Sequence, residues 1–382
     1  MARRGAQGSG SIRQRADGTW EARYTVGRDP GTGKQVQKSI YGKSQAEVRK
    51  KLAKVSTELD EGIYKDPTNI TVGEWLDIWL EEYNNSIKPY TRKAYEMNIR
   101  VHLKPGLGAT KLTALNVPTV QRFYNKKLDS LSAKSIKNLH GILHSALKQA
   151  TAIGYIRNNP ADNISLPKAT KQEIKPLDST QIKQFLMEIK GHTYEYVYIV
   201  ALFTGMRESE LLGLTWDCVD FEKGQILVKH QLQKDGTRRY FATLKNGKTR
   251  TITPAELVMQ TLATQKRKQI IEKSIAGDLW QEVDVENLVF TNPFGKYLTA
   301  MTVYKHYKQI VNRLGIPDKR LHDLRHSYAV AALMAGDDIK TVQENMGHHS
   351  AAFTLDVYGH VTDEMKKESA KRMDSFITNL YG

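Results

Sequence analysis

The chain has 382 residues and a formal net charge of +16, from 57 lysine and arginine residues against 41 aspartate and glutamate residues. This length exceeds one ordinary domain, and 40% hydrophobic residues are typical of a globular protein. The single cysteine, Cys218, excludes an internal disulfide and any cysteine metal cluster. No apolar run approaches the roughly 18 residues that a membrane span requires.

The positive charge favours a polyanion such as nucleic acid as the partner. On charge alone, a basic surface with no nucleic-acid role is the alternative. The first ten residues carry charge without a following apolar segment, which is not the pattern of a secretory signal, so we expect a cytoplasmic protein. Neither a P-loop nor a dinucleotide-binding glycine motif occurs, so nothing indicates nucleotide binding.

Residues 1–62 are predicted to form a small three-stranded sheet with one helix. Strands are predicted over 11–15, 20–26 and 34–41, with turn residues between them, and apolar and polar residues alternate over 20–26. Ser44 and Glu47 make a capping-box pattern that begins a helix ending near residue 58. The segment is basic, and a sheet of this size can enter a major groove.

Trp20, Ala22, Tyr24 and Val26 fall on one face of this sheet, which leaves Glu21, Arg23 and Thr25 on the face that could contact DNA. The candidate DNA contacts here are Arg13, Arg15, Arg23 and Lys38. The alternative is that these side chains form only a solvated face.

Residues 63–70 are an expected linker, and residues 71–166 read as an all-helical unit of four helices. Thr71 and Glu74 form a second capping box, and Trp75 and Trp79 follow on an apolar stripe that indicates core packing rather than base stacking. Six basic residues near helix starts or on polar faces could neutralise phosphates. They are Lys88, Arg92, Lys93, Arg100, Lys134 and Lys137.

A second linker is expected over residues 167–177, followed by a mixed α+β domain over 178–362 with a small antiparallel sheet. Its predicted strands lie around 225–228, 240–244 and 249–253. Residues 363–382 show one more amphipathic helical pattern.

Four short motifs in this third segment fit the cleavage of a phosphodiester by a side chain. Such chemistry needs a nucleophile, cations for the charge on the nonbridging oxygens, and an acid for the leaving 5′ oxygen. Arg207 in Thr204–Leu212 and Arg325 in His322–Arg325 suit the cationic task, because a guanidinium forks onto two phosphate oxygens. The other two motifs are Met346–His348 and Thr354–His360, and Tyr358 in the last motif follows His348 by ten residues.

Together these motifs resemble the active site of the tyrosine recombinases, the phage integrase family. The resemblance is specific over residues 200–360 and loose before that. It implies that Tyr358 is the nucleophile, that Arg207, His322, Arg325 and His348 serve the phosphate, and that Glu210 supports the site. It also implies an arm-type DNA-binding domain at 1–62, a core-binding domain at 71–166 and a catalytic domain at 178–362.

In the family, a lysine on a β-hairpin protonates the leaving hydroxyl. Lys245 fits this position, although Asn246 follows it where a threonine is commoner, and Lys248 is the rival. The family reaction needs neither metal nor ATP. A zinc site on His322 and His326, which are four residues apart, is the less favoured alternative because no carboxylate or cysteine cluster completes it.

The resemblance implies a DNA integrase of a mobile element, a phage or a transposon, that carries out DNA integration and excision by recombination through a 3′-phosphotyrosyl bond. Its partners would be double-stranded DNA with core-type and arm-type sites, further copies of the chain in a tetramer, and an accessory bending or excision factor. The final helix could dock on a neighbouring protomer.

A bacterial cytoplasm with association to the nucleoid is implied. A type IB topoisomerase and a catalytically silent DNA-binding regulator are the alternatives.

Overall fold

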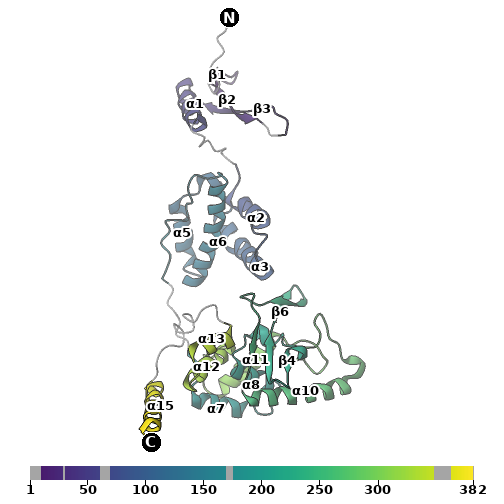
Figure 1. Cartoon of the computed structure of the whole chain (residues 1–382). Coiled ribbons are helices and arrows are strands. Elements are labelled where there is room, and N and C mark those ends of the chain that lie inside the picture. The colour runs from purple at the N-terminus through teal and green to yellow at the C-terminus, as the bar shows by residue number, and fades with distance from the viewer. Residues whose placement is uncertain (1–9, 29–30, 61–68, 169–174, 348–362, 382) are drawn as a thin grey trace. The chain divides into compact units, whose positions relative to one another are not determined.

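The computed structural model describes residues 10–28, 31–60, 69–168, 175–347 and 363–381 (Figure 1). The chain divides into two compact units, residues 1–171 and 172–382. The expected linkers at 63–70 and 167–177 overlap the stretches 61–68 and 169–174, which lie outside the described residues. The predicted fold class is confirmed, with a small sheet and helix, a helical part, and a part that mixes helices and strands.

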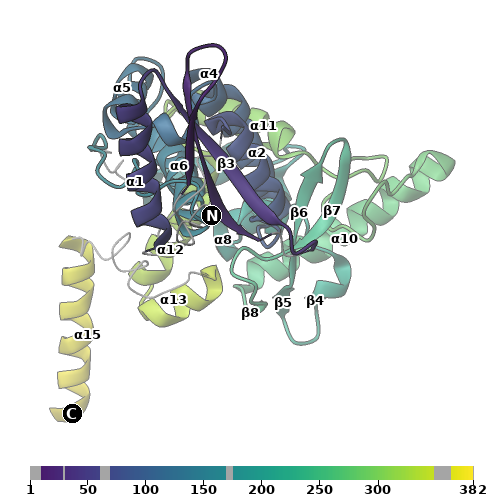
Figure 2. The same ribbon diagram turned by 90° about the horizontal axis from the view of Figure 1, so that it is seen from above.

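The N-terminal sheet is antiparallel in the order β1-β2-β3, with β1 at Ser11–Gln14, β2 at Trp20–Arg28 and β3 at Gln35–Gly42. Helix α1, Gln45–Asp60, packs on one face of this sheet through Val48 and Leu52. Figure 2 shows α1 alongside the strands. The alternating pattern predicted this packing, because Ala22 and Tyr24 of β2 are buried under the helix.

The helical part begins at the predicted capping box, where Thr71 Oγ1 accepts from the Glu74 amide and the Glu74 carboxylate accepts from the Thr71 amide. Trp75 and Trp79 are buried in its core, as predicted. Its helices are α2 at Val72–Glu82, α3 at Pro89–Asn98, α4 at Lys104–Leu107, α5 at Val117–Lys127 and α6 at Ala133–Ala152. A π-helical turn over Ile99–Leu103 joins α3 to α4.

Eight described helices belong to the second unit. They are α7 at Ser179–Glu188, α8 at Glu195–Thr204, α9 at Glu208–Leu211, α10 at Glu256–Ala276, α11 at Ala300–Arg313, α12 at Leu321–Met334, α13 at Ile339–Met346 and α15 at Asp363–Tyr381. Asp178 caps α7 by accepting a hydrogen bond from the amide of Gln181. Apolar side chains of α15 at Met373, Phe376 and Leu380 are exposed.

The strands of the second unit form two antiparallel sheets rather than one. Strands β4 at Val219–Asp220, β5 at Gln225–Val228 and β8 at Arg250–Ile252 form the first, in the order β4-β5-β8. Strands β6 at His230–Asp235 and β7 at Arg238–Thr243 pair with each other (Figure 2). The expectation that the strands flanking Lys245 form one hairpin is therefore wrong, because β7 pairs with β6 and β8 pairs with β5.

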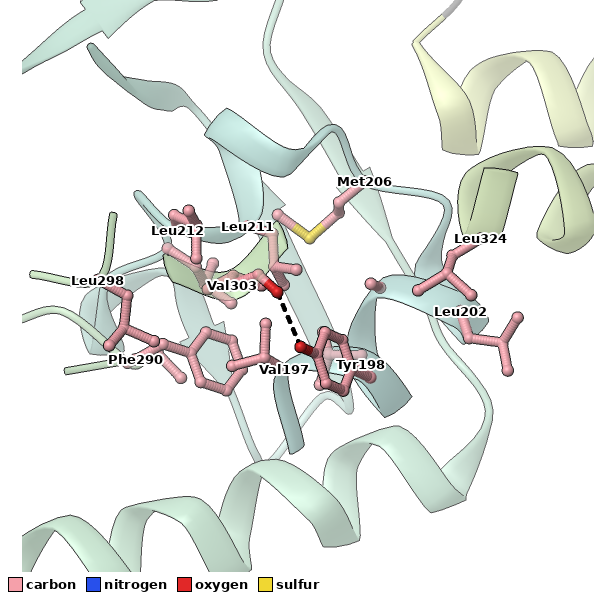
Figure 3. Close-up of a cluster of buried hydrophobic side chains, with 14 of the residues drawn as sticks. Val197, Tyr198, Leu202, Met206, Leu211, Leu212, Phe290, Leu298, Val303 and Leu324 are labelled. Atoms are coloured by element: carbon pink, nitrogen blue, oxygen red, sulfur yellow. Dashed lines mark hydrogen bonds between the residues drawn. The ribbon is translucent and has the colours of Figure 1, made fainter. Parts of the chain in front are cut away.

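A large apolar core lies beneath the motifs of the second unit (Figure 3). Met206 and Leu324, which directly precede Arg207 and Arg325 in the two arginine motifs, are both part of this core. Tyr198 of α8 donates its hydroxyl to the carbonyl oxygen of Val303 in α11 at 2.9 Å, so its one polar atom is satisfied inside the core. The two arginine motifs are thus anchored in the same hydrophobic core.

Candidate active site

The first arginine motif begins where α8 ends. Gly205 closes α8 in the left-handed conformation with φ of 62°, which favours glycine. A Cβ atom at this position would lie 2.4 Å from Cδ1 of Tyr328, so the close approach of α12 also requires glycine. The turn buries Met206 and leaves Arg207 at the start of α9.

Arg207 is bound to Glu210 by two hydrogen bonds. Arg207 Nη1 donates to Glu210 Oε1 at 2.7 Å, and the Arg207 amide donates to Oε2 at 3.0 Å. Burial by itself raises the pKa of the Glu210 carboxyl, but the hydrogen bond and charge of Arg250 and the charge of Arg207 outweigh it and hold the pKa below its ordinary value. Glu210 is therefore a buried anion that holds two guanidinium groups.

The second arginine, Arg325, lies on α12 and is buried. Its Nη1 donates to the carbonyl oxygen of Gly205, and its Nη2 donates to the carbonyl oxygen of Met346 at 2.7 Å. The structure thus brings Arg325 to the turn that carries Arg207, as the two sequence motifs require of a shared site.

His322 and His326 lie one turn apart on α12, with ring centroids 4.8 Å apart in an edge arrangement. His322 is in contact with solvent. Desolvation of its ring by the surrounding protein and the positive charge of Arg325 lower its pKa to about 4. Burial lowers the pKa of His326 to about 4 as well. Among the described residues, no group of three or more His, Cys, Asp or Glu side chains is placed to hold a metal ion.

Helix α13 ends at Gly347, which also has a left-handed φ of 64°. Three successive carbonyl oxygens at this end accept from three guanidinium groups. The Asn345 carbonyl accepts from Arg250 at 2.7 Å, the Met346 carbonyl from Arg325 at 2.7 Å, and the Gly347 carbonyl from Arg207 at 2.9 Å. Cations are favourable at the C-terminal end of a helix, where carbonyl oxygens lack partners.

The lysine turn runs between β7 and β8, and both Lys245 and Lys248 are exposed. Asn246 Nδ2 donates to the Gly347 carbonyl at 3.0 Å, so this turn contacts the end of α13. Lys248 lines a groove together with Arg207, Arg250 and Gly347.

His348 and Tyr358 lie outside the described residues, as do the motif residues between them. In the sequence, His348 directly follows Gly347, whose carbonyl Arg207 holds. Two residues that the sequence motifs did not single out, Arg250 and Asn345, belong to the described site. Their contacts join segments far apart in the sequence, so local pattern carried no signal for them.

The candidate DNA contacts of the N-terminal sheet surround one acidic residue. Glu21 is only 2% exposed although it lies on the face away from α1. Its carboxylate accepts from Arg13 Nε at 2.7 Å, from Arg23 Nε at 3.1 Å and from Ser39 Oγ at 2.7 Å. The hydrogen bonds from Ser39 and Arg13 lower the Glu21 pKa to about 2. The face is thus an ordered ion-pair cluster, not a loose row of side chains.

The other candidate contacts are all accessible to solvent. The guanidinium of Arg15 lies 5.4 Å from the ring centroid of Tyr41, and Lys38 is half-buried on β3. In the helical part, the six candidate basic residues fall into two groups. One group lies at the start of α3, along α3 and in its π-helical extension, and the other lies at the start of α6. The first group is Lys88, Arg92, Lys93 and Arg100, and the second is Lys134 and Lys137.

Comparison with known families matches the model "Phage integrase family" to residues 175–365 and the model "Phage integrase, N-terminal SAM-like domain" to residues 71–128. A tyrosine recombinase XerC-like protein of Caldanaerobacter subterraneus is 31% identical over 92% of this chain and 95% of its own length. An integrase of Streptomyces ambofaciens is 30% identical over 94% of each chain.

Solved structures share the fold. The Tn1549 transposon integrase, solved in complex with a circular intermediate DNA, superimposes with a TM-score of 0.69 at 23% identity, over 80% of this chain and 99% of that chain. Lambda integrase bound to a core site covers 95% of this chain and 99% of its own, with a TM-score of 0.57 at 19% identity.

The fold and the paired arginine motifs define a tyrosine recombinase. The chain belongs to the phage integrase family, and its activity is site-specific recombination of DNA. Among the helices of the described residues, none has the length and apolar character that crossing a membrane would require.

Proposed function

We propose that the chain is the integrase of a mobile genetic element and that Tyr358 is its nucleophile. The observation that carries the proposal is the meeting of Arg207 and Arg325 at the carbonyls of Met346 and Gly347, directly before His348 in the sequence. Two guanidiniums on one short stretch of backbone make a strongly cationic point, which suits a phosphate whose charge rises in the transition state.

In the proposed reaction, the Tyr358 hydroxyl passes its proton to His322, which its lowered pKa keeps neutral. The tyrosine oxygen attacks the scissile phosphorus, and the bond from phosphorus to the 5′ oxygen breaks. The DNA keeps a 3′-phosphotyrosyl bond, and the 5′ oxygen leaves as a hydroxyl after taking a proton from Lys245 or Lys248. Arg207 and Arg325 bind the nonbridging oxygens, His322 and His348 bond to the phosphate, and Glu210 holds Arg207 in place. Attack by the 5′ hydroxyl of a second strand on the phosphotyrosine reverses these steps and conserves the bond.

DNA binding by the first unit is part of the proposal. The sheet would read arm-type sites through Arg13, Arg15, Arg23 and Lys38, and the helical part would hold core-type sites through its six basic residues. The match of residues 71–128 to the family's N-terminal domain and the solvent access of these side chains support this. When the logarithm of the binding constant is plotted against the logarithm of the salt concentration, each neutralised phosphate would make the negative slope steeper by about 0.9.

The oligomeric state, the mobile-element origin and the cellular location of the chain are proposed from its relatives. Lambda integrase is known as a tetramer bound to a Holliday junction, and the Bacillus subtilis relative is the integrase of ICEBs1. We extend the tetramer, the mobile-element origin and a cytoplasmic, nucleoid-associated location to this chain. The exposed Met373, Phe376, Ile377 and Leu380 of α15 support docking of that helix on a neighbouring protomer.

Covalent trapping tests the proposed nucleophile. The protein is incubated with nicked candidate attachment-site DNA in the presence of chelator and run on a denaturing gel beside Tyr358→Phe. Tyr381→Phe is the matched control, because Tyr381 is a fully exposed tyrosine near the same end of the chain. A DNA-linked band in the wild type and in Tyr381→Phe, absent from Tyr358→Phe, is expected. A band that persists in Tyr358→Phe would mean that another residue attacks.

A further inference from the structure

Arg250 contacts more parts of the site than its place at the start of β8 suggests. Its side chain is only 10% exposed. Its Nη2 donates to Glu210 Oε2 at 2.6 Å, and its Nε donates to the carbonyl oxygen of Asn345 at 2.7 Å. Its backbone pairs with Val228 of β5, so the small sheet fixes its starting point.

These bonds join three segments that the proposed reaction needs together. Glu210 belongs to α9, which holds Arg207, and Asn345 belongs to α13, which leads to His348. Arg250 itself ends the turn that carries Lys245 and Lys248. A Cβ atom on Gly347 would lie 2.9 Å from Arg250 Nη1, so the end of α13 packs directly on this guanidinium.

We propose that Arg250 is a positioning residue for DNA cleavage. It holds Glu210, and through Glu210 the Arg207 guanidinium, and it fixes the end of α13 from which the chain continues to His348 and Tyr358. The inference rests on the proposed function. In the proposed arrangement, Arg250 contacts neither the phosphate nor the nucleophile, and it acts by fixing the geometry of the residues that do.

The geometry requires arginine in this position. Its two bonds leave the guanidinium in different directions, one to a carboxylate and one to a backbone carbonyl, and a planar fork makes both at once. A lysine ammonium retains the charge but cannot be expected to reach both acceptors. Misplacing a site by about 1 Å can slow a reaction by roughly 100-fold.

The test compares Arg250→Gln and Arg250→Lys with wild type in single-turnover cleavage of nicked attachment-site DNA at saturating DNA. Arg250→Gln should cleave about 100-fold more slowly and Arg250→Lys about tenfold, while DNA affinity stays within about threefold. Arg313→Gln is the matched control, because Arg313 also pairs with a glutamate, Glu188, at 2.6 Å in the same unit. It should cleave at the wild-type rate.

The pH profile separates positioning from simple stability. The charged groups bonded to Glu210 are Arg207 at the start of α9 and Arg250 from β8. Without Arg250, burial raises the Glu210 pKa, so cleavage by Arg250→Gln should fall further as the pH is lowered from about 8 to about 6. The Arg250→Gln, Glu210→Gln double variant should be slow without that added pH dependence.

Each outcome decides the proposal. Wild-type cleavage by Arg250→Gln, or a slow rate with no added pH dependence, would overturn it. Failure of both Arg250 variants to fold would also overturn it, because Arg250 would then be a structural residue. If wild-type protein forms no covalent adduct with DNA, the proposed function fails instead, and that result is visible before any Arg250 variant is compared.

Discussion

The carboxylate of Glu210 lies 2.7 Å from Arg207 Nη1, and only 1% of this glutamate is exposed. A buried anion shared by two guanidiniums depends on its charge, because removing one partner leaves the others uncompensated. Glu210→Gln preserves the shape but removes the charge. We expect a loss of about 3 kcal/mol in unfolding free energy and cleavage slower by at least tenfold.

Urea unfolding and single-turnover cleavage measure these two effects for Glu210→Gln. Glu256→Gln serves as the control, since Glu256 is exposed at the start of α10. Equal stability of wild type and Glu210→Gln would show that the charge of Glu210 contributes little to holding the two arginines.

Gly205 offers a test of how closely α12 must approach the arginine turn. Gly205→Ala forces a left-handed alanine and places its Cβ against the Tyr328 ring. Gly191→Ala is matched to it, because Gly191 has a φ of +76° with no atom within 4 Å of the added Cβ. Gly191→Ala should cost about 1 kcal/mol for the backbone alone, and Gly205→Ala above about 3 kcal/mol.

Denaturation midpoints of the two glycine variants report the difference directly. Similar losses in both would mean that the Tyr328 ring moves aside freely. That result would contradict a rigid contact between α12 and the turn that holds Arg207.

Local hydrogen bonds and apolar periodicity were predictable from the sequence. The Thr71 and Glu74 capping box joins residues three apart, so its donors and acceptors are visible in a short window. The burial of Trp75, Trp79, Ala22 and their neighbours followed in the same way from spacing along one helix or strand.

Contacts between distant segments were not predictable in this way. The polar turn around Lys245 indicated a hairpin, but β8 pairs with β5 rather than with β7. Strand pairing depends on which surfaces meet in the folded core, and no short pattern records that choice. Arg250 is one of 57 basic residues, and its role depends on Glu210 and Asn345, far from it in sequence.

The residues of the candidate site divide in the same way, into those that a local motif predicts and those that depend on contacts between distant segments. Arg207, His322 and Arg325 were found by motif, and the structure brings their segments together. His348 and Tyr358 rest on motif spacing and stay predictions. The burial of Glu21 under Arg13 and Arg23 was missed because strand alternation assigns a face but not the ion pairs on it.

The two histidines of α12 predict an acid-sensitive second unit. In the folded protein the pKa of His326 is about 4, whereas a histidine in an unfolded chain titrates near pH ~6.5. The unfolded state therefore takes up the proton first, and stability falls as the pH drops from about 6.5 towards 4. His322 acts in the same direction.

For His326 alone the loss should reach about 2 kcal/mol at pH 5, so His326→Gln should show a correspondingly weaker dependence on pH. Hydrogen exchange of α12 peptides, corrected for the intrinsic effect of pH, measures it. His144→Gln in the helical part is the control and should leave the dependence unchanged. An equally steep dependence in His326→Gln would contradict a neutral, buried His326.

The ion-pair cluster of the N-terminal sheet predicts a salt effect on DNA binding. For arm-site DNA, Arg23→Gln should make the negative slope of log affinity against log salt concentration shallower by about 1, because one phosphate contact is lost. Lys51→Gln on α1 is the control, since α1 covers the other face of the sheet. A loss of slope in Lys51→Gln but not in Arg23→Gln would place the DNA on the helix side.

Lys245 and Lys248 can be distinguished by the leaving group. A substrate with sulfur in place of the bridging 5′ oxygen releases a thiolate, which needs no proton donor because thiols titrate near pH ~8.5. Loss of a general acid slows an oxygen leaving group by roughly 100-fold to 10,000-fold. The alanine variant of the true acid should therefore cleave the oxygen substrate slowly and recover on the sulfur substrate.

The variant of the other lysine should resemble wild type on both substrates. Arg207→Gln supplies the contrast, because a residue that stabilises the nonbridging oxygens is still required when the leaving group is sulfur. Lys248 lines the groove beside Arg207, whereas Lys245 matches the family position, so either result is informative. Slow cleavage of both substrates by both lysine variants would mean that the turn binds the phosphate instead of protonating the leaving oxygen.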